Sequence, residues 1–242
     1  MYLKEVFSSL QGEGVLIGRR QLFVRLAHCN LACAYCDTDY AAGPLWSAEV
    51  VPGRGEVREH PNPAIAGELT DLVRNWQERL PLHHSLALTG GEPLLQSAAL
   101  AGWLPAVSRV LPVYLETNGT LPGPLAALLP YLTWISMDIK LAATTGAPTP
   151  WEAHAAFLSA ARPKICQTKL VVDACATDAD LVDVARFVQR HGPEIPLVLQ
   201  PRTVAGRPAV GGGRLLAMQA IAAREHLETL VIPQVHPLLS IR

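Results

Sequence analysis

The segment SLALTGGEP at residues 85–93 indicates the fold class. In it a short apolar run ends in a threonine, two glycines and a glutamate. The segments VYLETNG at 113–119 and WISMDIK at 134–140 repeat this plan of an apolar run followed by polar residues. Short apolar runs bounded by turn residues are typical of strands buried in a parallel sheet. The polar residues then lie at the carboxyl ends of the strands, where α/β proteins bind their ligands.

Helical periodicity alternates with these strands along the chain. Within 64–80 the apolar residues recur at helical spacing, at Ile65, Leu69, Leu72, Val73, Trp76 and Leu80. Further helices are expected at 94–108, 121–130, 151–161, 181–188 and 213–226, and further strands at 23–26, 169–172, 195–199 and 229–232. A chain that alternates strand and helix builds a parallel sheet with helical crossovers. We therefore expect an α/β fold in a single domain that spans residues 1–242.

Two segments interrupt this alternation. Residues 41–63 contain four prolines and three glycines without a steady period, which favours a loop inserted at the surface of the domain. Residues 141–150, LAATTGAPTP, indicate a second flexible loop.

Composition excludes several classes of protein. Lys and Arg number 20 and Asp and Glu 21, so the net charge of −1 gives no basic surface for nucleic acid. Half of the residues are apolar and 17% are charged, which excludes a disordered chain. The N-terminus lacks a signal-peptide pattern, and prolines interrupt the uncharged stretch 117–137, so neither secretion nor a membrane span is expected. Five sparse cysteines fit a reducing cytoplasm.

Three of those cysteines form one short motif. Cys29, Cys33 and Cys36 have the spacing C-x3-C-x2-C. Thiolates are soft ligands that suit zinc or iron–sulfur clusters. A cubane cluster held by three thiolates leaves one iron open to a ligand, whereas a zinc knuckle needs a fourth protein ligand, such as His28 or a distant cysteine. Both interpretations stay open on spacing alone.

The cysteine motif resembles the signature of the radical S-adenosylmethionine (SAM) superfamily. The resemblance implies a partial or modified (β/α) TIM-type barrel, with a [4Fe–4S] cluster on Cys29, Cys33 and Cys36. It also implies that the open iron binds SAM, whose reductive cleavage yields a 5′-deoxyadenosyl radical. A flavodoxin- or ferredoxin-like protein is the expected reductant.

The resemblance extends to polar residues at the other strand ends. The Gly-Gly-Glu-Pro loop at 90–93 is expected to hold the amino group of SAM, and Asn118 and Asp138 follow the next two strands. The full set of SAM-binding candidates is Tyr35, Asp37, Gly91, Glu92, Glu116, Asn118, Ser136, Met137, Asp138 and Gln200.

The segment SLQGEG at 9–14 and the Cys-Asp-Thr at 36–38 resemble one subfamily, 7-carboxy-7-deazaguanine synthase. The resemblance implies that 6-carboxy-5,6,7,8-tetrahydropterin loses ammonia and contracts to 7-carboxy-7-deazaguanine, a precursor of queuosine-type bases in tRNA. Thr38 is expected to bind Mg²⁺ together with oxygens of the substrate. The candidate substrate-binding residues are Leu10, Gln11, Gly12, Glu13, Arg25, Thr89, His236 and Arg242.

Chemistry supports some of these roles. The carboxylate of Glu13 and the amide of Gln11 can meet the N–H donors of a pterin edge, and the guanidinium of Arg25 suits a carboxylate. A homodimer follows from the resemblance, and Cys166 and Cys175 receive no role. The alternatives are an enzyme that activates a glycyl radical in a partner protein and a non-catalytic zinc module.

Overall fold

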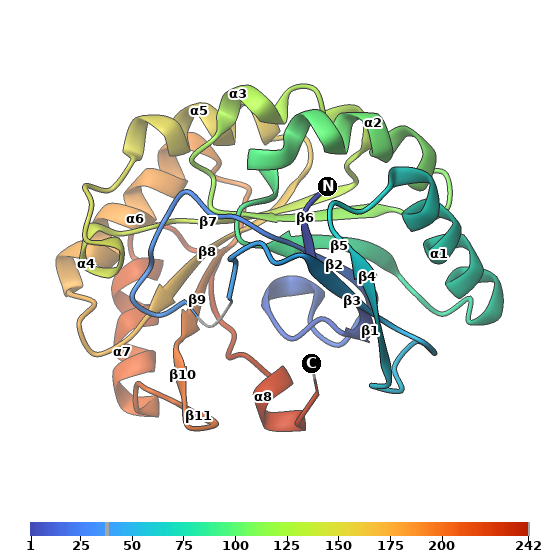
Figure 1. The fold of residues 1–242 in the computed structure, drawn as a ribbon. Helices are drawn as coiled ribbons and strands as arrows, with labels where there is room; N and C mark the ends of the chain where they lie inside the picture. The colour runs from blue at the N-terminus through green and yellow to red at the C-terminus, as the bar shows by residue number, and fades with distance from the viewer. Residues whose placement is uncertain (37–38, 242) are drawn as a thin grey trace.

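The computed structural model describes residues 1–36 and 39–241, in which the strands form one mostly parallel sheet (Figure 1). The strand order is β12-β9-β8-β7-β6-β5-β2-β1-β3-β4. Neighbouring strands from β2 to β12 all pair in parallel, whereas β1 runs antiparallel to β2. The expected α/β fold, a parallel sheet joined by helical crossovers, is therefore confirmed.

The strands of this sheet are β1 (Leu3–Leu10), β2 (Arg20–Leu26), β3 (Leu45–Glu49), β4 (Val57–Pro61), β5 (Ser85–Gly90), β6 (Val113–Thr117), β7 (Trp134–Asp138), β8 (Ile165–Val172), β9 (Leu197–Pro201) and β12 (Thr229–Val231). A separate small ribbon pairs β10 (Thr203–Val204) with β11 (Arg207–Pro208). The helices are α1 (Ala66–Arg79), α2 (Ser97–Val107), α3 (Pro122–Leu125), α4 (Ala142–Thr145), α5 (Trp151–Ala161), α6 (Asp178–His191), α7 (Gly212–Ala223) and α8 (His236–Leu239). Short 3-10 turns are η1 (Gly14–Leu16), η2 (Pro93–Gln96) and η3 (Leu129–Tyr131).

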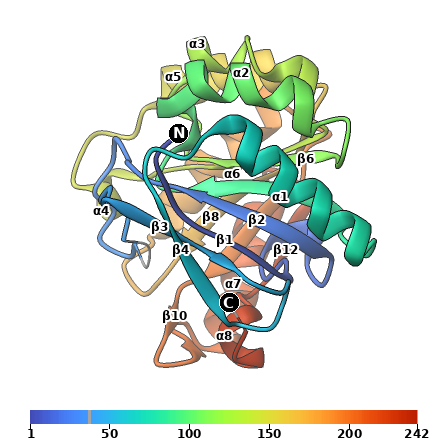
Figure 2. The same cartoon turned by 45° about the vertical axis from the view of Figure 1, so that its right-hand side comes forward.

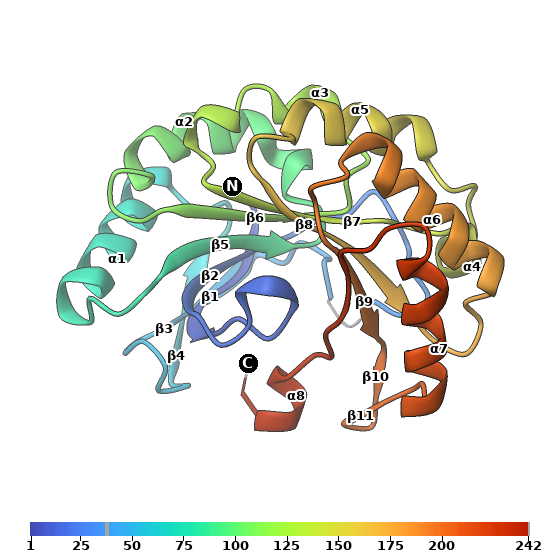
Figure 3. The same ribbon diagram turned by 180° about the vertical axis from the view of Figure 1, so that it is seen from behind.

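The sheet is curved, and its two faces differ. Helices from α1 round to α7 cover the convex face, while η1 and α8 lie under the concave face (Figures 1 and 3). Successive side chains of β2 point to opposite faces of the sheet, which explains why the two faces differ. Leu22, Val24 and Leu26 enter the main core beneath the helices, whereas Phe23 belongs to a second apolar cluster on the other face. Arg25 shares the alternation of Phe23, which directs its side chain to the concave side.

The segment 41–63, which we expected to be a loop, instead contains β3 and β4, which pair antiparallel and extend the sheet beyond β1 (Figure 2). Trp46 and Ala48 are buried in the main core, so the alternate residues of β3 follow the pattern of a strand. The prolines and glycines around β3 made this short pattern hard to recognise in the sequence. The turn is held by Glu49, whose carboxylate accepts hydrogen bonds from the backbone N–H groups of Ser8, Gly53 and Gly55 at 3.0, 2.6 and 3.1 Å.

Other expected elements differ in extent. The helix expected at 121–130 is replaced by α3 and η3, and part of the loop expected at 141–150 is the short helix α4. Strand β1 was not anticipated, because its sequence LKEVFSSL places pairs of polar residues between the apolar ones and so lacks both strict alternation and a continuous apolar run. In the described part of the chain, no helix combines the length and apolar character that a membrane crossing requires.

The hydrogen bonds of Glu49 predict a measurable contribution of this side chain to the free energy of unfolding. Glu49 is 3% exposed, so in Glu49→Ala three buried or half-buried N–H groups lose a charged acceptor. We expect the free energy of unfolding to fall by about 2–3 kcal/mol in urea titrations. Glu59→Ala, on exposed β4, is the matched control and should change it by less than about 0.5 kcal/mol. Equal effects of the two substitutions would contradict the role of Glu49.

Candidate functional site

A cavity of about 680 Å³ opens on the concave face, along the carboxyl ends of the parallel strands. Most of the residues expected at the site line this cavity, namely Leu10, Gln11, Gly12, Glu13, Arg25, Cys29, Cys33, Tyr35, Cys36, Thr89, Gly91, Glu116, Asn118, Asp138, Gln200 and His236. Glu92, Ser136 and Met137 do not line it. Asp37, Thr38 and Arg242 lie outside the described residues.

The three cysteines of the motif lie on the loop after β2 and line the cavity. Burial raises the pKa of the Cys29 and Cys33 thiols above their ordinary value. Within residues 1–36 and 39–241, no three His, Cys, Asp or Glu side chains stand close enough to hold a metal ion. The fit to a cluster therefore rests on the donor set, which is three soft thiols on one loop beside one cavity.

Within the described part of the chain, the three side chains considered as a fourth ligand for a zinc site, His28, Cys166 and Cys175, lie apart from the cavity lining. Cys166 lies on β8, where its Sγ is 3.4 Å from the carbonyl of Ile135, and Cys175 is exposed before α6. The ring of His28 lies edge-on to Tyr2, with 5.5 Å between centroids. None of these three candidates is among the residues that line the cavity.

Gly90 and Gly91 bring the cysteine loop and the loop after β5 into direct backbone contact. Gly90 has φ +120°, and a Cβ on it would stand 2.2 Å from the carbonyl oxygen of Leu26. A Cβ on Gly91 would stand 1.9 Å from the carbonyl oxygen of His28. The space that a Cβ would need is thus taken by the end of β2 and by the cysteine loop, while both glycines also line the cavity. Their first role is therefore to pack one loop on the other.

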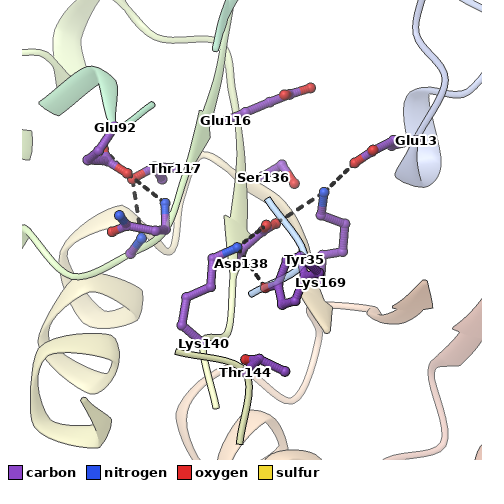
Figure 4. A network of polar contacts seen from close by, with 12 residues as sticks. Glu13, Tyr35, Glu92, Glu116, Thr117, Ser136, Asp138, Lys140, Thr144 and Lys169 are labelled. Carbon is purple, nitrogen blue, oxygen red and sulfur yellow. Dashed lines mark hydrogen bonds and ion pairs between the residues drawn. The ribbon is translucent and has the colours of Figure 1, made fainter. Parts of the chain in front are cut away.

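Glu92 joins the loop after β5 to the loop after β6. Its carboxylate accepts hydrogen bonds from the N–H groups of Leu94 and Asn118 and from the hydroxyl of Thr117, at 3.0, 2.7 and 2.8 Å (Figure 4). Burial raises the pKa of Glu92 to about 7, although these hydrogen bonds act in the opposite direction. The carboxylate is fully buried and bonded to protein groups, and its expected contact with the amino group of SAM stays a prediction.

A chain of charged groups runs across the cavity (Figure 4). Glu13 forms a short ion pair with Lys169, whose Nζ also lies 3.3 Å from Asp138 Oδ1. The other oxygen of Asp138 accepts a hydrogen bond from Lys140 Nζ at 2.8 Å. Lys140 Nζ in turn lies 3.1 Å from the hydroxyl of Tyr35 on the cysteine loop and 5.2 Å from its ring centroid. The chain thus connects the SLQGEG segment to the cysteine loop.

Lys140 and Lys169 were missed in the sequence. Lys140 follows β7 in WISMDIK, Lys169 lies within β8 in ICQTKLVV, and each residue is 8% exposed. A lysine inside or directly after a buried parallel strand is the signal that could have found them, because a buried ammonium needs carboxylate partners.

Glu13 is held as an anion by this chain of charges. Burial by itself raises its pKa, but the charge and hydrogen bond of Lys169 and hydrogen bonds from Gln234 and Gln200 outweigh burial and lower it to about 2. The amide of Gln234 donates to Glu13 Oε1 at 2.7 Å. Gln234 was also missed, although it lies in the C-terminal segment next to His236.

A second carboxylate occupies the cavity floor. Glu116 accepts hydrogen bonds from the hydroxyl of Thr89 and the amide of Gln11, both at 2.7 Å. Burial raises its pKa above the ordinary value, against the charge of Lys169. Gln11 also donates to Gln21 at 2.9 Å and accepts from the N–H of Glu13 at 3.0 Å, so its amide orients protein groups.

The remaining expected residues have these surroundings. Arg25 lines the cavity and its Nε donates to Glu5 at 2.8 Å, which fixes the guanidinium above the ring of Phe7. Gly12 packs on His236, since a Cβ on Gly12 would stand 2.3 Å from the Nδ1 of that histidine. Ser136 is buried and accepts from the amide of Gln167 at 2.7 Å, and Met137 belongs to the main core.

Comparisons with known proteins agree with this geometry. Residues 24–147 match the family model described as the Radical SAM superfamily. A protein of Geobacter sulfurreducens named 7-carboxy-7-deazaguanine synthase is 40% identical over 238 residues, which cover 97% of this chain and 95% of that protein. A protein of the same name from Methanothermobacter thermautotrophicus is 33% identical, over 98% of this chain and 96% of its own. The crystal structure of QueE from Escherichia coli shares the fold, with a TM-score of 0.62 and 19% identity over 96% of this chain and 92% of that one.

The contact between the two loops predicts the effect of a single methyl group. In Gly91→Ala the new Cβ meets the His28 carbonyl, so the cysteine loop must shift. We expect the free energy of unfolding to fall by about 1–3 kcal/mol, with reduced iron and sulfide content after anaerobic reconstitution. Gly102→Ala, where a Cβ on α2 meets open space, should leave both unchanged or slightly raise stability. Full iron incorporation in Gly91→Ala would show that the contact is dispensable.

Proposed function

The chain belongs to the 7-carboxy-7-deazaguanine synthase family of the radical SAM superfamily, and on that premise we propose that its cavity converts 6-carboxy-5,6,7,8-tetrahydropterin to 7-carboxy-7-deazaguanine with loss of ammonia. One observation carries the proposal. The same cavity is lined by Cys29, Cys33 and Cys36 and by Glu13, which Lys169 holds ionised. Candidate residues for a cofactor and for a polar heterocycle thus share one cavity.

The radical SAM family implies a [4Fe–4S] cluster and SAM, and the donor set fits both. Cys29, Cys33 and Cys36 would hold the cluster, and Asn118 and Asp138 line the cavity where SAM would lie. When bound, the two groups supply the radical that removes a hydrogen atom from the substrate. The protein positions the reactants and keeps water away from them.

The chain's own residues meet the pterin in a defined way. The ionised carboxylate of Glu13 accepts hydrogen bonds from the ring N–H and amino donors of the pterin edge. The guanidinium of Arg25, braced by Glu5, faces the carboxylate of the substrate. Thr89 and Glu116 present a hydroxyl and a carboxyl from the cavity floor. These groups orient the ring without taking part in electron transfer.

Further parts of the proposal come from the sequence resemblance. Mg²⁺ would bind at Thr38 together with the substrate, and a flavodoxin- or ferredoxin-like protein would supply electrons. The enzyme would act as a homodimer in the cytoplasm, as a single domain in which 41–63 is an insertion. Measurable Mg²⁺ affinity without substrate would count against the coupled binding.

An anaerobic assay tests the proposed function. Reduced, reconstituted protein receives the pterin, SAM and Mg²⁺, and the formation of a deazapurine is followed. We expect product to form while SAM is regenerated, with about four irons per chain. Stoichiometric zinc without sulfide would support the zinc module. SAM cleavage without any pterin conversion would support the activation of a glycyl radical in a partner protein.

Glu13 supplies the sharpest variant for this assay. Glu13→Gln keeps the shape but removes the charge that accepts both pterin donors, so we expect kcat/KM for the pterin to fall about 100-fold. Cleavage of SAM without pterin should persist, because the ion pair and hydrogen bond of Glu13 go to Lys169 and Gln234, which lie outside the cysteine loop. Glu228→Gln, at an exposed site, is the matched control and should behave as the unsubstituted protein. Equal activity of the two variants would remove Glu13 from the substrate site.

A further inference from the structure

We propose that Lys169 is a positioning residue for the pterin, which holds the Glu13 carboxylate in place by bridging it to Asp138. This inference rests on the proposed function and adds to it a residue that the sequence motifs do not include. Lys169 reaches the site from β8, Glu13 from the segment after β1 and Asp138 from the end of β7. One side chain therefore ties the substrate half of the cavity to the cofactor half.

The contacts leave Lys169 little freedom. Its side chain is 9% exposed, and its ammonium group makes the short contact with Glu13 Oε2 and the 3.3 Å contact with Asp138 Oδ1 (Figure 4). Burying an ammonium group costs several kcal/mol unless carboxylates surround it. Glu13 and Asp138 supply that compensation, so the position of each depends on Lys169.

Four neighbouring elements place titratable groups around Glu13. Lys169 comes from β8, Asp138 from β7 and Glu116 from β6, while His236 of α8 packs on the adjacent Gly12. Lys169 is the cation that Glu13, Asp138 and Glu116 share. Without it, the carboxyl groups of Glu13 and Glu116 lose their shared cation, and their repulsion favours protonation, whereas Asp138 keeps Lys140 as a partner.

Protonation of Glu13 would disturb pterin binding directly. An ionised carboxylate accepts from two donors of the pterin edge, whereas a protonated one presents a donor of its own. Gln200 adds to this recognition surface. Its amide hydrogen bonds to Glu13, and its buried Oε1 finds no hydrogen-bond partner in the described part of the chain. Lys169 thus keeps Glu13 as an ionised acceptor for the donor edge of the pterin.

The link to Asp138 extends this effect toward the cofactor half. Asp138 lies between Lys169 and Lys140, and Lys140 reaches Tyr35 on the cysteine loop. The alternating carboxylate and ammonium groups thus link Glu13 to that loop. A neutral side chain at position 169 would remove the cation that holds Glu13 but leave the ion pair of Asp138 and Lys140 in place. We therefore expect the affinity for the pterin to fall more than the affinity for SAM.

The test compares Lys169→Met, Lys169→Gln and Lys169→Arg in anaerobically reconstituted protein, with Lys164→Met as the matched control near the opposite end of β8. Pterin affinity is measured by equilibrium binding without reductant, from pH 5.5 to 8.5, and kcat/KM is measured for turnover. Circular dichroism identifies variants that fold, and Lys169→Gln serves if the methionine variant does not.

We expect the neutral variants to bind pterin about 30-fold more weakly at neutral pH. The sign of the pH dependence follows from Glu13. With Lys169 present its pKa is about 2, so it stays ionised throughout the range. Without Lys169 its pKa rises, so binding should weaken as the pH falls, and the acid limb of kcat/KM should move to higher pH. Lys169→Arg should restore most of the affinity, and SAM affinity should change less than pterin affinity.

Two results would overturn this role for Lys169. One is unaltered pterin affinity in a folded neutral variant. The other is an equal loss at every pH that Lys169→Arg does not restore, which would indicate a structural role only. Tight pterin binding by the unsubstituted protein without any conversion would instead contradict the proposed function, so the two failures are distinguishable.

Discussion

The backbone contact between the cysteine loop and the loop after β5 is the constraint on which the rest of the site depends. The carbonyl oxygen of His28 occupies the space that a side chain at position 91 would need, and the N–H of Glu92 donates to that same oxygen at 2.8 Å. Glu92 then ties both loops to the start of the next loop through Asn118. Three strand ends are thereby fixed relative to one another, and the cysteine loop lines the cavity that they share.

Paired charges hold together the part of the cavity between Glu13 and the cysteine loop. Buried ions are tolerated only when each has a partner, and here carboxylates and ammonium groups alternate from Glu13 through Lys169, Asp138 and Lys140 to the phenol of Tyr35. The same residues that hold this side of the cavity together therefore define where a polar substrate and a cofactor can lie. Binding and folding therefore share these contacts, which join strands β7 and β8 to the loops that carry Glu13 and the cysteines.

The sequence predicted those parts of the molecule that local patterns specify. Apolar runs such as Ser85–Leu88 located parallel strands, and polar residues after them located the edge where ligands bind. Local patterns could not locate Lys169 in the site, because its partner Glu13 is 156 residues away. The hairpin of 41–63 was missed for a related reason, since its turn is stabilised by Glu49 and by pairing with β1. The orientation of Glu92 also depended on Thr117 and Asn118, which lie on another strand end.

Electron paramagnetic resonance of the reduced, reconstituted protein tests most directly whether the three cysteines leave one iron of a cubane cluster to SAM. We expect the spectrum of a reduced [4Fe–4S] cluster, with g values that change when SAM is added. A spectrum that SAM leaves unchanged, or a cluster that needs Cys166 or Cys175 as a fourth ligand, would contradict the open iron on which the proposed chemistry depends.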